Sequence, residues 1–123
     1  AMAAGLSILK ALDADSDIYS RLDKKTERLE KGFKSVLKNK QIPFQINRVG
    51  SMISLHFTNK PVVDFESSAG GNTERFNKYF HGMLNNGIYL PPSSFESYFL
   101  NDALTNEDID KTINSLSKII TEL

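Results

Sequence analysis

The chain has 123 residues and a mass of 13.8 kDa, which fits one ordinary domain with a hydrophobic core. Hydrophobic residues make up 40% of the sequence and charged residues 24%, so collagen-like, low-complexity and largely disordered chains are excluded. The 15 basic residues balance the 15 acidic ones, and we therefore expect no nucleic-acid or membrane partner. Because cysteine is absent, disulfides, thiolate catalysis and cysteine-ligated metal sites are excluded.

No apolar run approaches the roughly 20 residues that a membrane helix needs, and the first residues lack the basic leader of a signal peptide. We therefore expect a cytoplasmic protein. The sequence starts directly in helix-forming residues without a cap. This start indicates either an expression scar at Ala1-Met2 or a fragment of a longer protein.

The first predicted helix covers residues 1–12 and ends at a polar break over residues 13–17. A second helix runs from there to about Lys38, with Ser16 or Asp17 as its cap. The charged residues of this helix, between Arg21 and Lys34, are predicted to form a solvated face. Its apolar residues recur near the helical period: Ile18, Leu22, Leu29, Phe33, Val36 and Leu37.

Two neighbouring strands are predicted next, over Phe44–Val49 and Ser51–Thr58. In the second strand large apolar residues occupy every other position, at Ile53, Leu55 and Phe57. Gly50 between the strands suggests a bend or bulge rather than a two-residue hairpin. The polar segment Phe65–Gly71 is predicted to be flexible.

A third long helix is predicted to begin at the cap Asn72 and to end at Asn86-Gly87. Short strands are expected at Ile88–Leu90 and around Ser97–Leu100, followed by a last helix that a capping box at Thr105 opens. Adjacent strands favour an α+β domain, a small antiparallel sheet with helices packed on one side. We expect one core cluster, consisting of Ile53, Leu55, Phe76, Phe80, Met83, Ile109, Ile113 and Leu116.

Common catalytic motifs are absent. His56 and His81 have no second histidine or carboxylate at ligand spacing, so no metal site is predicted. Gly70-Gly71 matches neither a dinucleotide-binding fingerprint nor a phosphate-binding loop, and no nucleophile-elbow serine occurs.

One loop differs from this background. Pro91-Pro92 sets a rigid extended turn, Ser93 and Ser94 supply short polar groups, and Glu96 follows among aromatic residues. Such a carboxylate is either an exposed loop residue or a group aimed into a site, and the pattern alone leaves both interpretations open.

Several short motifs, each weak alone, occur in an order and at spacings that resemble the C-terminal region of the glutamate-1-semialdehyde 2,1-aminomutase family. The resemblance covers essentially the whole chain. Its motifs are AMAAG at Ala1–Gly5, RVGSM at Arg48–Met52, HFT at His56–Thr58, the stretch Asn72–Glu96 containing GIYLPPSSFE, and LTNEDIDKTI at Leu104–Ile113.

This resemblance implies an isomerase of the class III aminotransferase group. Such an enzyme has fold type I, uses pyridoxal phosphate and is usually a homodimer. It would convert glutamate 1-semialdehyde to 5-aminolevulinate, a precursor in tetrapyrrole (porphyrin) biosynthesis. The chain would be the smaller C-terminal domain, a single domain over residues 1–123. The large domain, with the Schiff-base lysine and the phosphate-binding loops, would lie upstream. We expect no bound cofactor and no activity in the isolated chain.

The resemblance also assigns site residues. Glu96 matches the active-site glutamate of the family's SQFE-like motif, and Ser93 and Ser94 would lie beside the substrate. Ser94 stands where the family usually has glutamine, and Leu104 where it has histidine, which suggests a divergent or paralogous member. Two alternatives remain: a domain of another class III aminotransferase, and a non-catalytic interaction module.

Overall fold

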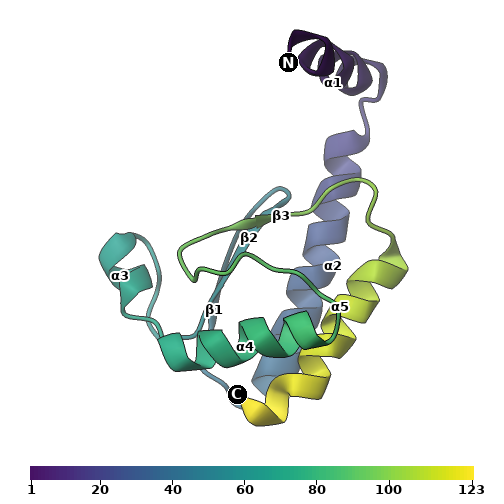
Figure 1. Cartoon of the computed structure of the whole chain (residues 1–123). Helices are drawn as coiled ribbons and strands as arrows, with labels where there is room; N and C mark the ends of the chain where they lie inside the picture. Colours follow the sequence, from purple (N-terminus) through teal and green to yellow (C-terminus); the bar gives the residue numbers. More distant parts are fainter.

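The computed structural model describes all residues, 1–123, as helices packed on a small sheet (Figure 1). The α+β prediction is confirmed. In chain order the elements are α1 (Met2–Ala14), α2 (Ile18–Asn39), β1 (Gln45–Val49), β2 (Met52–His56), α3 (Phe65–Ala69), α4 (Thr73–Asn85), β3 (Tyr98–Phe99), α5 (Asn106–Ile119) and a 3₁₀ turn (Ile120–Glu122).

The sheet is antiparallel, in the order β1-β2-β3. Val49 pairs with Met52, so Gly50 and Ser51 form a two-residue hairpin turn. The predicted bulge at Gly50 is therefore wrong. Gly50 has a φ of +56°, and two-residue hairpin turns require positive φ at the position it occupies.

The core lies between one face of the sheet and helices α2, α4 and α5. Tyr79 of α4 is at its centre, 1% exposed, with edge-on ring contacts to Phe33 and Phe57. Phe80 and Ile113, predicted as core residues, are only partly buried against this cluster. The other six predicted core residues are buried: Ile53, Leu55, Phe76, Met83, Ile109 and Leu116.

Two glycines let α5 approach both neighbouring helices closely. A Cβ atom on Gly32 of α2 would lie 2.6 Å from Cγ1 of Ile113, and one on Gly82 of α4 would lie 2.9 Å from Cδ1 of Ile119. Real Cβ atoms do not approach other atoms so closely. Glycine in a helix interior is unfavourable, so its presence at both crossings is explained by packing rather than by helix propensity.

Several predicted caps are confirmed. The Asn72 side chain accepts a hydrogen bond from the Arg75 amide at 2.9 Å and opens α4. Gly87, with a φ of +77°, follows the end of α4. Thr105 and Asp108 form the reciprocal capping box of α5.

Two local predictions are wrong. The segment predicted to be flexible contains α3, because Asp64 and Ser67 form a reciprocal capping box at its start. Ile88–Leu90 is not a strand. Leu90 is buried in the core, but the chain then enters Pro91-Pro92, which has no N–H groups to continue a ladder.

The charged face of α2 is also less solvated than predicted. Lys25, whose side chain is only 17% exposed, and Arg21 both bind the Asp102 carboxylate, at 2.8 and 2.6 Å. These hydrogen bonds hold the pKa of Asp102 well below its usual range. On the next turns Glu30 pairs with Arg48 of β1 at 2.8 Å. Thus α2 is joined by ion pairs to both the loop before α5 and the sheet.

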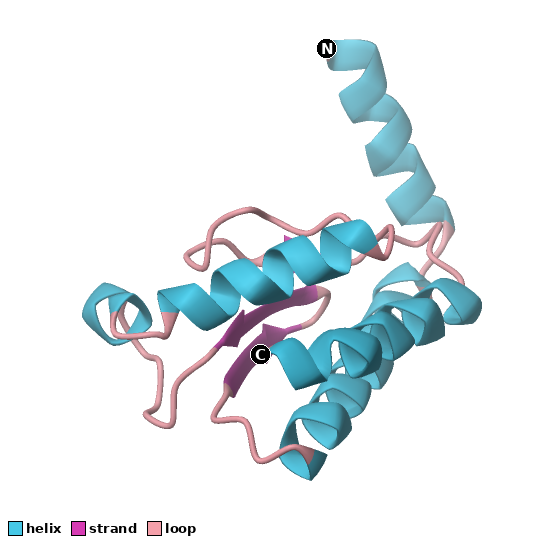
Figure 2. Ribbon diagram, turned by 60° about the horizontal axis from the view of Figure 1, so that its bottom comes forward, coloured by secondary structure: helices cyan, strands magenta, loops and turns pink.

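Helix α1 stands apart from the rest of the domain (Figure 2). None of its residues is buried, and four large apolar side chains are exposed: Met2, Leu6, Ile8 and Leu9. No helix of the chain is both long and apolar enough to cross a membrane.

The glycine contacts predict an unusual response to alanine. We expect Gly32→Ala to lower the free energy of unfolding by about 1–3 kcal/mol, since overpacking outweighs the gain in helix propensity. Gly5→Ala in α1, where a Cβ atom meets nothing within 4 Å, is the matched control. Because it creates no close contact, it should not lower the unfolding free energy in urea titrations and should raise it by at most about 1 kcal/mol, the gain in helix propensity. Equal effects of the two substitutions would contradict the packing argument.

Candidate functional site

The loop between α4 and β3 carries the three residues assigned to the site. Its turn is closed locally: the Glu96 amide donates to the Ser93 carbonyl oxygen at 3.1 Å, and the Phe95 amide donates to Ser93 Oγ at 3.2 Å. Ser93 and Ser94 are half-buried. The sequence motif thus folds as one compact turn with Glu96 at its end.

The side chain of Glu96 is exposed and forms no ion pair or hydrogen bond within the chain. The nearest aromatic residue in sequence, Phe95, turns away to the neighbouring α3. A carboxylate left open in this way is available to groups outside these 123 residues. Its role in a site stays a prediction.

Helix α3 lies beside this turn. Figures 1 and 2 both show the α4–β3 loop reaching towards it. The rings of Phe65 in α3 and Phe95 in the loop are stacked, with centroids 5.3 Å apart and an angle of 19° between the ring planes. No sequence pattern predicted this contact, because the two residues are separated by all of α4.

His56 lies under α3 and is 7% exposed. Its Nε2 is 3.2 Å from Ser54 Oγ, and its Nδ1 is 3.5 Å from Ser68 Oγ of α3. Burial lowers the pKa of His56 from its ordinary value of 6.5. His81 is exposed on α4, and no cluster of three metal-ligating side chains occurs in the chain.

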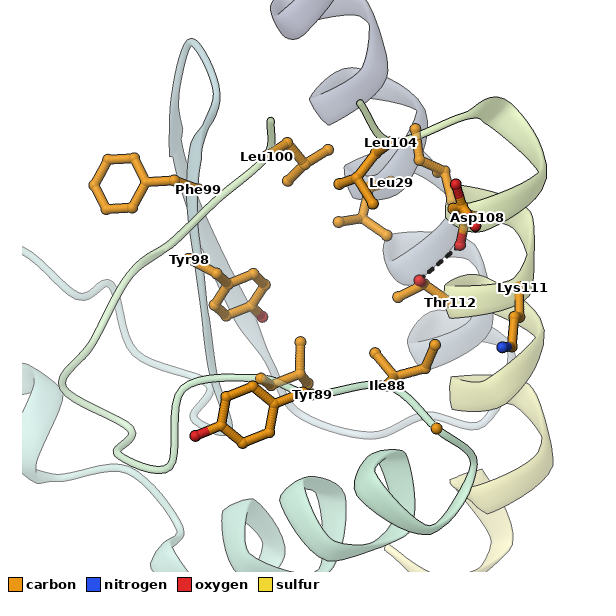
Figure 3. A pocket seen from close by; sticks show the side chains of 13 residues that line it. Leu29, Ile88, Tyr89, Tyr98, Phe99, Leu100, Leu104, Asp108, Lys111 and Thr112 are labelled. Atoms are coloured by element: carbon orange, nitrogen blue, oxygen red, sulfur yellow. Dashed lines mark hydrogen bonds between the residues drawn. The ribbon is translucent and has the colours of Figure 1, made fainter. Parts of the chain in front are cut away.

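A pocket of about 300 Å³ opens between the start of α5 and the segments flanking the loop (Figure 3). Leu29, Ile88, Leu100 and Leu104 give it an apolar wall. Lys111 stands at its rim. Neither the assigned serines nor Glu96 line this pocket. The sequence did not predict it, because its residues come from four separate segments.

Large apolar side chains are also exposed on the sheet. The pairings Val49–Met52 and Met52–Phe99 place these three residues side by side on the face opposite the core. Val49 is 72% exposed and Phe99 67% exposed. Such a patch beside the Glu96 loop is typical of a surface that another protein segment covers.

Comparisons with known proteins identify the family, although no family model matches the chain. Three proteins named glutamate-1-semialdehyde 2,1-aminomutase match nearly all of it. The match from Flavobacterium johnsoniae is 54% identical over 97% of the chain, that from Thermus thermophilus 48% over 98%, and that from Bacillus subtilis 43% over 100%. The chain belongs to the C-terminal domains of the glutamate-1-semialdehyde 2,1-aminomutase family. It spans about 28% of the length of these relatives.

Solved structures agree on the fold of this C-terminal domain. An ω-transaminase from Sphaerobacter thermophilus has a TM-score of 0.79 at 18% identity. The match covers 98% of this chain and 27% of the transaminase chain. A glutamate-1-semialdehyde aminomutase from Pseudomonas aeruginosa has a TM-score of 0.76 at 21% identity, over 88% of the chain and 24% of its own. The fold is therefore that of class III aminotransferases of fold type I, as the resemblance implied.

The buried histidine beneath α3 predicts a pH dependence. Because the pKa of His56 is lower in the folded chain than in the unfolded chain, the unfolded chain binds the proton more readily. Above about pH 6.5, where His56 is neutral in both states, its ionisation does not reduce the free energy of unfolding. The free energy of unfolding should fall as the pH decreases below this value.

Urea titrations between about pH 7.5 and 5 measure this slope, in a range where most carboxylates stay ionised. His56→Gln, which cannot be protonated, should flatten the slope. The exposed His81→Gln is the matched control and should leave it unchanged. An unaltered slope in His56→Gln would show that another group causes the pH dependence.

Proposed function

We propose that this chain is the C-terminal domain of a pyridoxal-phosphate-dependent aminomutase. The intact enzyme would convert glutamate 1-semialdehyde to 5-aminolevulinate in tetrapyrrole biosynthesis. The observation that carries the proposal is the set of relatives of that name, which are 42–54% identical over at least 97% of the chain.

The residues of this chain do not form a cofactor site by themselves. Each lysine is either exposed or, like Lys25 and Lys34, bonded to a carboxylate, and none points into an enclosed pocket. A lysine that binds pyridoxal phosphate covalently needs a different setting. Two solved neighbours are described as a complex with PMP and as a PLP-bound transaminase. We assign the cofactor lysine and the phosphate-binding groups to the upstream domain, so the isolated chain would be inactive.

The contribution of this chain would be one wall of the active site. Pyridoxal phosphate serves as the electron sink in such reactions. Glu96 is held on the turn after Pro91-Pro92. Its side-chain carboxylate would position the amino group of the substrate or tune a proton transfer. Ser93 and Ser94 would lie beside the substrate. The exposure of Glu96 and its lack of an internal partner support this role.

The exposed apolar surfaces support an upstream partner domain. The relatives are more than three times as long as the chain, which matches about 28% of their length. We propose that the upstream domain covers α1 and the sheet patch of Val49, Met52 and Phe99. The homodimer that the family resemblance implies and the cytoplasmic location that the sequence leads us to expect belong to the same proposal.

A second candidate is another class III aminotransferase, which passes the amino group to a separate acceptor. Ser94 and Leu104, which differ from the usual residues of the aminomutase family at these positions, keep this candidate open. The two differ in a simple assay on the intact protein. The aminomutase forms 5-aminolevulinate without any added amino acceptor, whereas the aminotransferase requires one.

The role of Glu96 predicts a separation of activity from stability. Glu96→Gln keeps the side-chain shape and removes its charge. In the intact enzyme it should lower turnover by about 10²-fold or more, the range for a positioned acid–base group. In the isolated chain it should change the unfolding free energy by no more than about 0.5 kcal/mol. The exposed Glu122→Gln is the control for turnover. Normal turnover in Glu96→Gln enzyme would remove Glu96 from the site.

One substitution, made both in the isolated chain and in the intact protein, tests whether the upstream domain covers α1. Leu9 is 64% exposed here, so Leu9→Ala should change the unfolding free energy of the isolated chain by less than about 0.5 kcal/mol. In the intact protein, where Leu9 would be buried, the loss should be about 2–5 kcal/mol. The same small effect in both proteins would show that α1 is not covered by the upstream domain.

A further inference from the structure

Phe65 and Phe95 form an aromatic contact that the proposed function does not use. Their rings are stacked, yet 72% of Phe65 and 54% of Phe95 stay exposed. The contact therefore joins α3 to the Glu96 loop outside the main core. We propose that Phe65 is a positioning residue, which holds Phe95 and so fixes the backbone that carries Glu96. Its catalytic consequence rests on the proposed function.

The turn itself needs such an anchor. Its hydrogen bonds, from the Glu96 and Phe95 amides to Ser93, join residues no more than three positions apart. Local bonds set the shape of the turn but not its place on the domain. No hydrogen bond joins residues 91–97 to the rest of the chain. The side chain next to Glu96 instead reaches across to Phe65.

Helix α3 is a firm support for this contact, although it has only five residues. Before it, the carbonyl oxygen of Val62, a buried residue, accepts a hydrogen bond from the Asn47 side chain at 2.8 Å. After it, the Asn72 amide donates to the carbonyl oxygen of Phe57 at 3.0 Å. Beneath it, Ser68 contacts the buried His56. The segment is thus fastened to the sheet at both ends and from below.

The position of Phe65 fits the same explanation. It is the first residue of α3, directly after the cap Asp64, and none of the residues of α3 is buried. A large exposed ring there does not contribute to the main core. Stacked rings are a favoured arrangement for an aromatic pair. Together with the fixed α3, this contact determines where Phe95, and hence Glu96, lies.

The first measurement is the mobility of the loop in the 123-residue chain. We expect backbone amide order parameters at residues 95–97 to be near the rigid value of about 0.85 and to fall towards about 0.6 in Phe65→Ala. Phe65→Tyr, which keeps the stacked ring, should retain the rigid value. Tyr19→Ala removes a similarly exposed ring from α2 and is the matched control. Unchanged order parameters at residues 95–97 in Phe65→Ala would overturn the inference.

The second measurement is turnover of the intact enzyme. Phe65→Ala should lower kcat about tenfold or more, as small displacements of a positioned group do, with KM nearly unchanged, and Phe65→Tyr should restore kcat. If Glu96→Gln lowers turnover but Phe65→Ala does not, the positioning role is overturned and the proposed function stands. If the intact protein forms no 5-aminolevulinate, the proposed function fails. If Glu96→Gln has normal turnover, only the role of Glu96 in the site fails, and the order parameters alone decide whether Phe65 orders the loop.

Discussion

The close approach of α5 to two other helices is the constraint on which the rest of the domain depends. Ile113 and Ile119 of α5 fit against Gly32 of α2 and Gly82 of α4, where any side chain would collide with them. With α5 in this position, the three helices enclose Tyr79 and cover one face of the sheet. The remaining features, including the Glu96 loop, are attached to this frame.

The domain leaves apolar groups exposed in two places that its own core does not need. One is α1, which carries four exposed large apolar side chains, and the other is the sheet patch next to the Glu96 loop. Exposing apolar surface to water is unfavourable, so a partner that covers these side chains gains binding free energy. In the proposed function, these are the surfaces through which an upstream domain would be held against Glu96.

Much of the fold follows from local sequence signals, since the caps at Asn72 and Thr105 and the helical periods place the long helices correctly. What sequence reasoning missed depends on contacts between distant segments. The predicted core includes Phe80 of α4 but not its neighbour Tyr79, and only the packed structure shows that Tyr79 lies at the centre. The capping box before α3 was missed because its third residue is Ser67 rather than glutamate or glutamine.

In the candidate site, too, the sequence predicts local features but not contacts between distant segments. The family motif identifies Glu96, but it contains no information about the stacked ring of Phe65 that supports it.

The most direct test of the account is a crystal structure of the intact protein with bound pyridoxal or pyridoxamine phosphate. We expect the Glu96 carboxylate to face the cofactor, within direct or water-mediated hydrogen-bonding reach of it or of the substrate site. A Glu96 side chain that points into bulk solvent, away from the cofactor, would contradict the account.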